Sequence, residues 1–167
     1  MDIGLLVLRL AVGLTMAAHG GQKLFGWFGG HGLGGTGGFL ESLGFRPGRV
    51  QAALAGGGEM VGGLLLALGL LTPVGAAIVL AVMVVATVSV HLGKGFFLSD
   101  GGAEYNVLIM AATAALAFTG PGAYSLDAVD GLGVSGWRPG VLAIVVGLVL
   151  GAGALAARRP VPVAGGA

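Results

Sequence analysis

Long apolar runs, separated by short polar or glycine-rich stretches, dominate the chain. Five runs approach or reach the roughly 20 residues that a helix needs to cross about 30 Å of hydrocarbon. They cover residues 3–25, 50–71, 74–92, 103–118 and 141–157, and the last two are short for a span. The pattern predicts an all-α fold, a polytopic transmembrane helical bundle.

The composition supports this prediction and narrows the chemistry. Hydrophobic residues make up 56% of the chain and charged residues 9%, against roughly 25% charged residues in soluble domains. The first run is not typical of a removable signal, because it begins with Asp2 and contains Arg9. The absence of cysteine excludes disulfides, thiol relays and thiolate-bound metals from this chain. A net charge of +1 without a basic cluster predicts no nucleic-acid partner.

Lysine and arginine are unevenly distributed between the two sides that five spans define. One side holds six of them and the other holds Arg138 alone; the six are Lys23, Arg46, Arg49, Lys94, Arg158 and Arg159. The positive-inside rule then places the N-terminus outside and the C-terminus in the cytoplasm. If the last run did not cross, the ratio would fall to four against three, so the asymmetry also supports five helices.

Small residues recur at spacings of three and four in the run 50–71, on both sides of Glu59. This spacing places them along one face of a helix, where another helix backbone can approach closely in a membrane. We therefore expect Glu59 to face the protein interior. The short turn at residues 70–73 predicts an antiparallel hairpin of the second and third helices, with Pro73 in the first turn of the third.

The connecting segments differ in character. Residues 26–49 are rich in glycine and predict a loop along the membrane surface, with a short helix over 39–43 that Thr36 caps and Gly44 ends. The aromatic residues near it suit the headgroup level: Phe25, Trp27, Phe28 and Phe39. Residues 120–140 predict an external loop without a helix, and residues 158–167 a disordered tail.

Ionisable side chains inside apolar runs are the candidate functional residues, because each is costly in hydrocarbon and needs a partner or a function. Two interpretations of Glu59 are open. It forms an ion pair with Arg9 that joins the first two helices, or it is a carboxylate that exchanges a proton with a ligand or with His19. Both can hold at once.

The histidines also allow two interpretations. His19 and His91 lie near helix ends, where an imidazole can reach water, or they join Glu59 and Glu104 around a quinone headgroup or a metal ion. Metal is the weaker alternative, because the residues come from separate helices without HExxH or ExxH spacing. No metal site is predicted.

Polar residues at two helix ends complete the candidate set. Glu104, Tyr105 and Asn106 open the fourth run and Lys23 ends the first, and these positions suit helix capping or interface anchoring as well as ligand contact. The functional hypothesis assigns catalysis to three residues and ligand binding to five: Glu59, His19 and His91, then Arg9, Lys23, Glu104, Tyr105 and Asn106.

Several motifs occur over roughly residues 4–126: RL at 9–10, HGGQKLFG at 19–26, FLE at 39–41, GGE at 57–59, GG at 62–63, LTP at 71–73, His91, GFF at 95–97 and EYN at 104–106. Together they resemble the DoxX family of small bacterial inner-membrane proteins. The resemblance implies a four-helix transmembrane core over residues 1–126, similar to methylamine-utilisation and vitamin K epoxide reductase-like proteins. An external loop (127–140), an additional fifth transmembrane helix (141–157) and the tail would follow it.

The resemblance also implies a function. The family takes its name from a thiosulfate:quinone oxidoreductase subunit, and other members are associated with membrane redox complexes or oxidative-stress defence. We therefore expect a component of a quinone-linked redox or oxidative-stress system in a bacterial plasma membrane, with a quinone as ligand and protein partners or further copies of itself. The alternative is a non-enzymatic anchor or assembly subunit for a soluble oxidoreductase. A proton-coupled transporter is less favoured, because no inverted repeat is evident.

Overall fold

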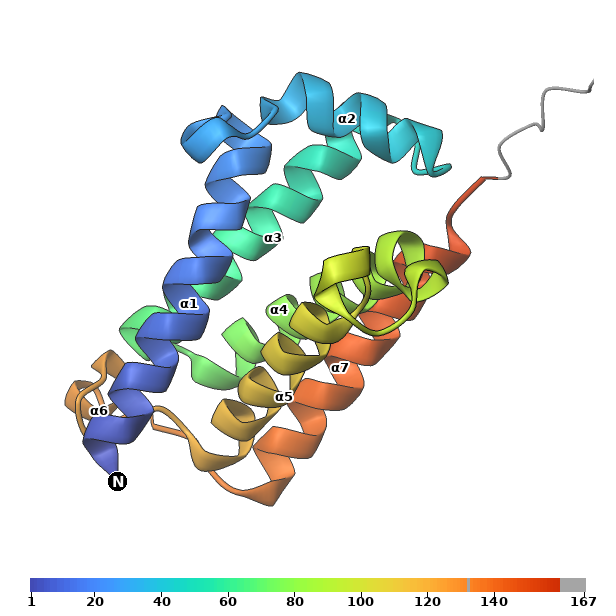
Figure 1. The fold of residues 1–167 in the computed structure, drawn as a ribbon. Coiled ribbons are helices and arrows are strands. Elements are labelled where there is room, and N and C mark those ends of the chain that lie inside the picture. Colours follow the sequence, from blue (N-terminus) through green and yellow to red (C-terminus); the bar gives the residue numbers. More distant parts are fainter. Residues whose placement is uncertain (132, 160–167) are drawn as a thin grey trace, which may run out of the picture.

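The computed structural model describes residues 1–131 and 133–159, which are helical with no strand. Five longer helices run alternately up and down the bundle: α1 (Asp2–Phe25), α3 (Gly48–Leu68), α4 (Thr72–Ala86), α5 (Glu104–Thr119) and α7 (Trp137–Ala156). Two shorter helices, α2 (Gly32–Ser42) and α6 (Leu126–Val129), lie at opposite ends (Figure 1), which we call the α2 end and the α6 end. The all-α fold is as predicted.

Helix lengths separate four of these helices from the fifth. Within the described residues, α1, α3, α7 and α4 with its continuation to Lys94 are long and apolar enough to cross a membrane. Helix α5 has 16 residues and is shorter, so a fifth crossing stays a prediction. The sequence predicted a short last helix over 141–157, but α7 has 20 residues because it already begins at Trp137. Pro139 is tolerated because it lies in the first turn of α7.

The longer helices form two groups. Helices α1 and α3 pack along each other with α2 across their ends, while α4, α5 and α7 form the second group (Figure 1). The groups meet where α3 contacts α4 through the predicted hairpin turn and where α1 contacts α5. In the described part of the chain, α3 and α7 do not pack extensively against each other. Two cavities, described below, are lined by residues of both groups.

Glycines bring the backbones of α1 and α3 together. A Cβ atom on Gly13 would lie 2.5 Å from the Gly63 carbonyl oxygen, and one on Gly20 would lie 2.5 Å from the Gly56 carbonyl oxygen. On another side of α3, a Cβ on Gly62 would lie 3.2 Å from the Gly75 carbonyl oxygen of α4. The small-residue face predicted for α3 is confirmed, and it serves two neighbouring helices.

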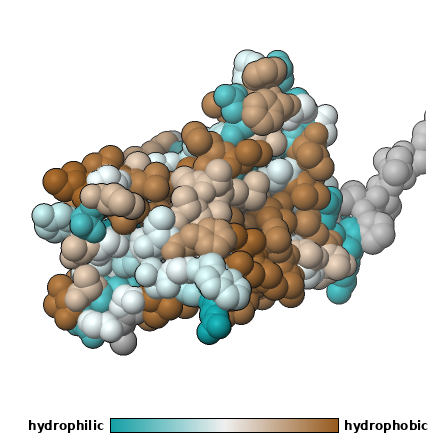
Figure 2. Space-filling model, turned by 90° about the horizontal axis from the view of Figure 1, so that it is seen from below, coloured by the Kyte–Doolittle hydropathy of each residue, from teal (hydrophilic) through white to brown (hydrophobic). Residues whose placement is uncertain are grey.

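The surface of the bundle is largely apolar. Exposed aliphatic side chains occur on every long helix, including Val7, Leu54, Val74, Leu108 and Val149. On the face seen from the α6 end, Figure 2 shows hydrophobic residues over much of the surface, with hydrophilic residues between them. Apolar side chains on the outside and polar ones inside are the arrangement expected of helices that contact lipid.

The connecting segments contain more structure than the sequence predicted. The short helix expected over 39–43 is part of α2, which begins at Gly32 despite its glycines. Contacts with α3 stabilise it: Gly37 packs closely on the Arg49 backbone, and the Gly48 N–H donates to Glu41 Oε1 at 2.8 Å. Gly44 follows the helix with φ +91°, as predicted for a helix end. Tertiary contacts therefore outweigh the low helix propensity of glycine.

The predicted helix-free loop at 120–140 is wrong, because α6 forms within it and α7 begins before its end. Ser125 starts α6 by accepting a hydrogen bond from the Ala128 N–H at 3.2 Å. Of the predicted tail, Arg158 and Arg159 contact the α2–α3 loop: the Arg159 N–H donates to the Gly44 carbonyl at 2.9 Å. Residues 160–167 lie outside the described residues.

Candidate functional site

An ion pair lies between α1 and α3 in the half of the bundle nearer the α2 end. Lys23 Nζ donates to Glu59 Oε1, and this is the only ion pair in the part of the chain that the structure describes. The Glu59 side chain is 1% exposed, whereas that of Lys23 is 29% exposed. The other carboxylate oxygen, Oε2, is buried without a hydrogen-bond partner. The predicted inward orientation of Glu59 is therefore confirmed, and one acceptor oxygen is left over.

The expected ion pair between Glu59 and Arg9 is wrong. Arg9 lies at the α6 end, 1% exposed, where Nη1 donates to the Pro121 carbonyl at 2.8 Å and Nη2 donates to the Tyr124 carbonyl. The structure thus separates Arg9 from the other candidate residues. It fixes the segment before α6 onto α1.

Asp127 is a buried acid at the α6 end that the sequence analysis did not single out. Its carboxylate accepts hydrogen bonds from the Leu71 N–H at 2.8 Å, the Thr72 N–H at 3.2 Å and the Thr72 hydroxyl at 3.1 Å. The two backbone N–H groups lie at the start of α4, where such donors have no partner within the helix and normally need a cap. Asp127 thus caps α4 from a distant segment, which no local sequence signal indicates.

Aromatic and imidazole rings lie beside the ion pair. The ring centroids of His19 and Tyr105 are 5.8 Å apart, which joins α1 to α5. His19 Nδ1 lies 2.9 Å from the Thr15 carbonyl oxygen. The Tyr105 hydroxyl is buried without a hydrogen-bond partner, like Glu59 Oε2. The structure therefore brings His19 and Tyr105 to the same region as the Lys23–Glu59 pair.

The end of α4 is irregular where it meets this region. Residues Thr87–His91 form a turn of π-helix, a conformation often found at functional sites. Asn106 Nδ2 donates to Thr87 Oγ1 at 3.2 Å and so ties the turn to α5. His91 Nδ1 lies 2.7 Å from the Gly101 carbonyl oxygen. The Ser89 hydroxyl in the same turn is buried without a hydrogen-bond partner.

A cavity of about 260 Å³ lies beside this region, a little below the roughly 300–1,000 Å³ typical of ligand pockets. Glu59 and Tyr105 are not among the residues that line it. Most of its lining is apolar, and we call it the polar cavity after the five polar residues that it contains: His19, Lys23, Thr36, Ser89 and His91. The two histidines come from helices far apart in the sequence, and the cavity brings them together with the lysine that holds Glu59. The sequence did not indicate Ser89 as a site residue, although it is two residues from His91. Thr36 was expected to cap a short helix, but α2 begins at Gly32 and Thr36 lies within it, lining the cavity.

The remaining candidates have structural contacts. Glu104 is exposed and its Oε2 accepts a hydrogen bond from the Leu98 N–H at 2.9 Å, which fits the helix-end interpretation. Asn106 is 3% exposed and holds the π-helical turn. Neither residue is among those lining the polar cavity. In the described residues no cluster of three or more histidine or acidic residues is suited to a metal ion.

The helical fold, the apolar exterior and the buried charges define a multi-pass membrane protein. The sequence model of the DoxX family matches residues 4–92, more than half of the chain. The protein belongs to the DoxX family. The matched segment includes Lys23, Glu59 and both cavity histidines, and it ends before α5 and α7. No curated protein and no solved structure matches the chain.

Proposed function

We propose that the polar cavity binds the headgroup of a lipid-soluble quinone, and that the protein is a membrane component of a quinone-linked redox or oxidative-stress system. The observation that carries this proposal is the Lys23–Glu59 pair, which lies beside a cavity lined by two histidines. Buried charges in a membrane protein are costly and usually functional.

The polar residues fit a quinone headgroup because its carbonyl oxygens accept hydrogen bonds. The Lys23 ammonium has three N–H donors and uses one of them on Glu59. The Ser89 hydroxyl is a further donor that lacks a partner. These groups can hold the two oxygens of a quinone ring from different sides of the cavity.

The histidines are suited to holding protons. Because a carbonyl oxygen only accepts hydrogen bonds, Nδ1 of His19 and Nδ1 of His91 carry a hydrogen toward Thr15 and Gly101. In the neutral ring Nε2 is then unprotonated, and it becomes a donor when the imidazole takes up a proton. A quinone bound here would supply the electron-accepting chemistry, with two electrons delivered by the redox partner of the proposed system, and His19, His91 and Glu59 would hold the two protons that accompany them.

Replacement of Glu59 tests the proposal. In Glu59→Gln the shape of the side chain is kept, but Lys23 loses its counter-charge and the site loses a proton carrier. Glu59 holds the Lys23 ammonium beside the cavity, so its replacement should cost the quinone the hydrogen bond from Lys23. Hydrogen bonds to charged groups contribute about 1.5–3 kcal/mol, and we therefore expect quinone affinity to fall roughly 10- to 100-fold in purified protein in lipid nanodiscs. His19→Gln and His91→Gln should lower quinone-dependent turnover in the native membrane.

Matched controls come from the exposed residues Glu41 and His31, which lie at the α2 end and do not line the polar cavity. Glu41→Gln and His31→Gln should bind quinone like the wild type. Unchanged quinone binding in a folded Glu59→Gln protein would contradict the proposed function.

A membrane anchor for a soluble oxidoreductase is the second candidate, favoured by exposed aromatic side chains around the turn after α1. Phe25, Trp27, Phe28 and Phe39 are 50–74% exposed, and the first three rings contact one another in sequence. In this case Trp27→Ala with Phe28→Ala should abolish recovery of a partner after mild solubilisation, whereas Glu59→Gln should leave recovery intact. The opposite result favours the quinone site.

A further inference from the structure

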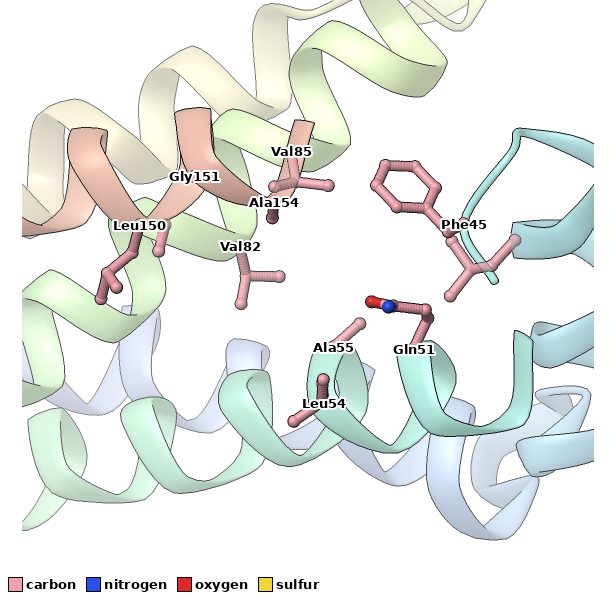
Figure 3. Close-up of a pocket in the computed structure, with 11 residues that line it drawn as sticks. Phe45, Gln51, Leu54, Ala55, Val82, Val85, Leu150, Gly151 and Ala154 are labelled. Carbon is pink, nitrogen blue, oxygen red and sulfur yellow. The ribbon is translucent and has the colours of Figure 1, made fainter. Parts of the chain in front are cut away.

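A second cavity of about 160 Å³ lies next to the polar cavity, on the side toward α7. The two share a common boundary of five residues: Leu40, Phe45, Ala55, Val82 and Val85. Apart from Gln51, the lining of the second cavity is apolar, and we call it the apolar cavity. Figure 3 shows Leu150 and Ala154 of α7 on one side of it and Leu54 and Ala55 of α3 on the other.

The apolar cavity opens sideways, onto the surface that contacts lipid. Leu54 and Leu150 line it and are 64% and 55% exposed, and the helices that carry them do not pack extensively against each other in the described segments. Toward the α2 end it is closed by Phe45, which is 4% exposed. The Arg158 guanidinium lies 5.2 Å from the centre of the Phe45 ring, and its Nε donates to the Leu43 carbonyl at 3.0 Å.

We propose that the ligand of the polar cavity carries a long apolar chain, and that this chain passes through the apolar cavity and enters the bilayer between α3 and α7. The inference rests on the proposed function and names its substrate class, a prenylated quinone instead of a water-soluble ring. The five residues shared by the two linings make the cavities neighbours, and the chain would pass between these side chains. Five of the thirteen residues that line the polar cavity are polar, against Gln51 alone in the apolar cavity, which suits a polar head beside a hydrocarbon tail.

Helix α7 thereby gains a specific role. Leu150, Gly151 and Ala154 form the α7 side of the path, and all three lie outside the segment that the family model matches. Substitutions on α7 can therefore alter chain binding without touching the residues that contact the headgroup.

Two alanines on α7 provide a matched test. Ala154 lines the apolar cavity, whereas Ala152 is exposed and lines neither cavity. Two probes are compared in phosphatidylcholine nanodiscs: a benzoquinone with a long prenyl chain and the same ring without the chain. We expect Ala154→Phe to weaken binding of the prenylated quinone about tenfold or more, because displacing a few methylene groups from an apolar site is sufficient for such a change.

The same substitution should leave the affinity for the chain-free ring unchanged, and Ala152→Phe should change neither affinity. Leu54→Trp is a second variant, on the opposite side of the apolar cavity. Its position is exposed and therefore tolerates a larger side chain, and we expect the same effect on binding as for Ala154→Phe. A cooperative unfolding transition in detergent, at a temperature close to that of the wild type, shows that each variant is folded before its binding is compared.

The outcomes separate this inference from the function on which it rests. The chain path would be overturned if both Ala154→Phe and Leu54→Trp bind the prenylated quinone like the wild type. It would also be overturned if the folded variants lose affinity for both probes equally. In either case the proposed headgroup site stands. Complete displacement of the prenylated quinone by phospholipid, with no effect on the ring, would assign the apolar cavity to a lipid and overturn the inference. If neither probe binds the wild type saturably, the proposed function and the chain path are both wrong.

Discussion

The partner of Glu59 is decided by the register of two helices and not by residue type. Gly13 packs against Gly63 and Gly20 against Gly56, so α1 and α3 run antiparallel with fixed levels. In this register Arg9 lies beside Ala67, about two helical turns beyond Glu59. The Glu59–Arg9 ion pair expected from the sequence would require the Arg9 side chain to span that distance. The carbonyls of Pro121 and Tyr124, which the sequence could not place, bind it instead.

Arg9 should matter for stability and not for ligand binding. In Arg9→Met the buried carbonyl of Pro121 and the carbonyl of Tyr124 lose their donor, and an unsatisfied buried hydrogen-bonding group costs about 1–3 kcal/mol. We expect a lower unfolding temperature in detergent with unchanged quinone affinity. Arg138→Met, at an exposed arginine beside Trp137, is the control and should alter the unfolding temperature little. A loss of quinone affinity in a fully stable Arg9→Met protein would return Arg9 to the ligand site.

At the scale of elements, hydrophobic runs located the longer helices because lipid imposes both length and apolar character on them. The short helices were misplaced for a different reason. Helix α2 depends on its contact with α3, and α6 depends on contacts with Arg9, Gly69 and Thr72, which are remote from it in the sequence. The π-helical turn at Thr87–His91 has no signal in the apolar pattern either, although it positions Ser89 and His91. Local sequence thus predicts an element only where local physics decides it.

The α1–α3 contact predicts opposite effects for two glycines on the same helix. A Cβ on Gly63 would meet backbone atoms of α1 at 2.5–2.6 Å, whereas one on Gly57 meets nothing within 4 Å. Gly63→Ala should therefore destabilise the protein by about 1–3 kcal/mol through overpacking. Gly57→Ala should be neutral or stabilising by up to about 1 kcal/mol, because alanine is the better helix former. Equal unfolding temperatures for the two variants in one detergent would contradict this close approach of α1 and α3.

For the whole molecule, the candidate site was predictable as a region and not as a set of contacts. The small residues around Glu59 indicated that it faces inward, and the histidines were recognised as candidates near the same helix ends. The cavity itself requires the divergence of two helix groups, and its apolar continuation requires α7. Neither is encoded in the periodicity of a single helix, because both depend on how five helices are placed around one another.

The charge distribution predicts the orientation of the bundle. Ser42 is exposed at the α2 end and Ser135 is exposed near the opposite end, and the chain has no native cysteine. With the positive side in the cytoplasm, a membrane-impermeant maleimide should label Ser135→Cys in intact spheroplasts and Ser42→Cys only after permeabilisation. Labelling of both positions from outside would contradict an odd number of membrane crossings between Ser42 and Ser135. The reversed labelling pattern would mean that the protein has the opposite orientation in the membrane.

The pairing of Lys23 with Glu59 has an electrical consequence. The negative charge of the carboxylate and the positive charge of the ammonium cancel, so the ion pair has no net charge on which a transmembrane voltage can act. Protonation of the carboxylate leaves a lone cation part of the way across the field, where a complete crossing is worth about 2.3 kcal/mol per 100 mV. Any step that passes through this protonated state is therefore sensitive to energisation of the cell, and steps that preserve the pair are not.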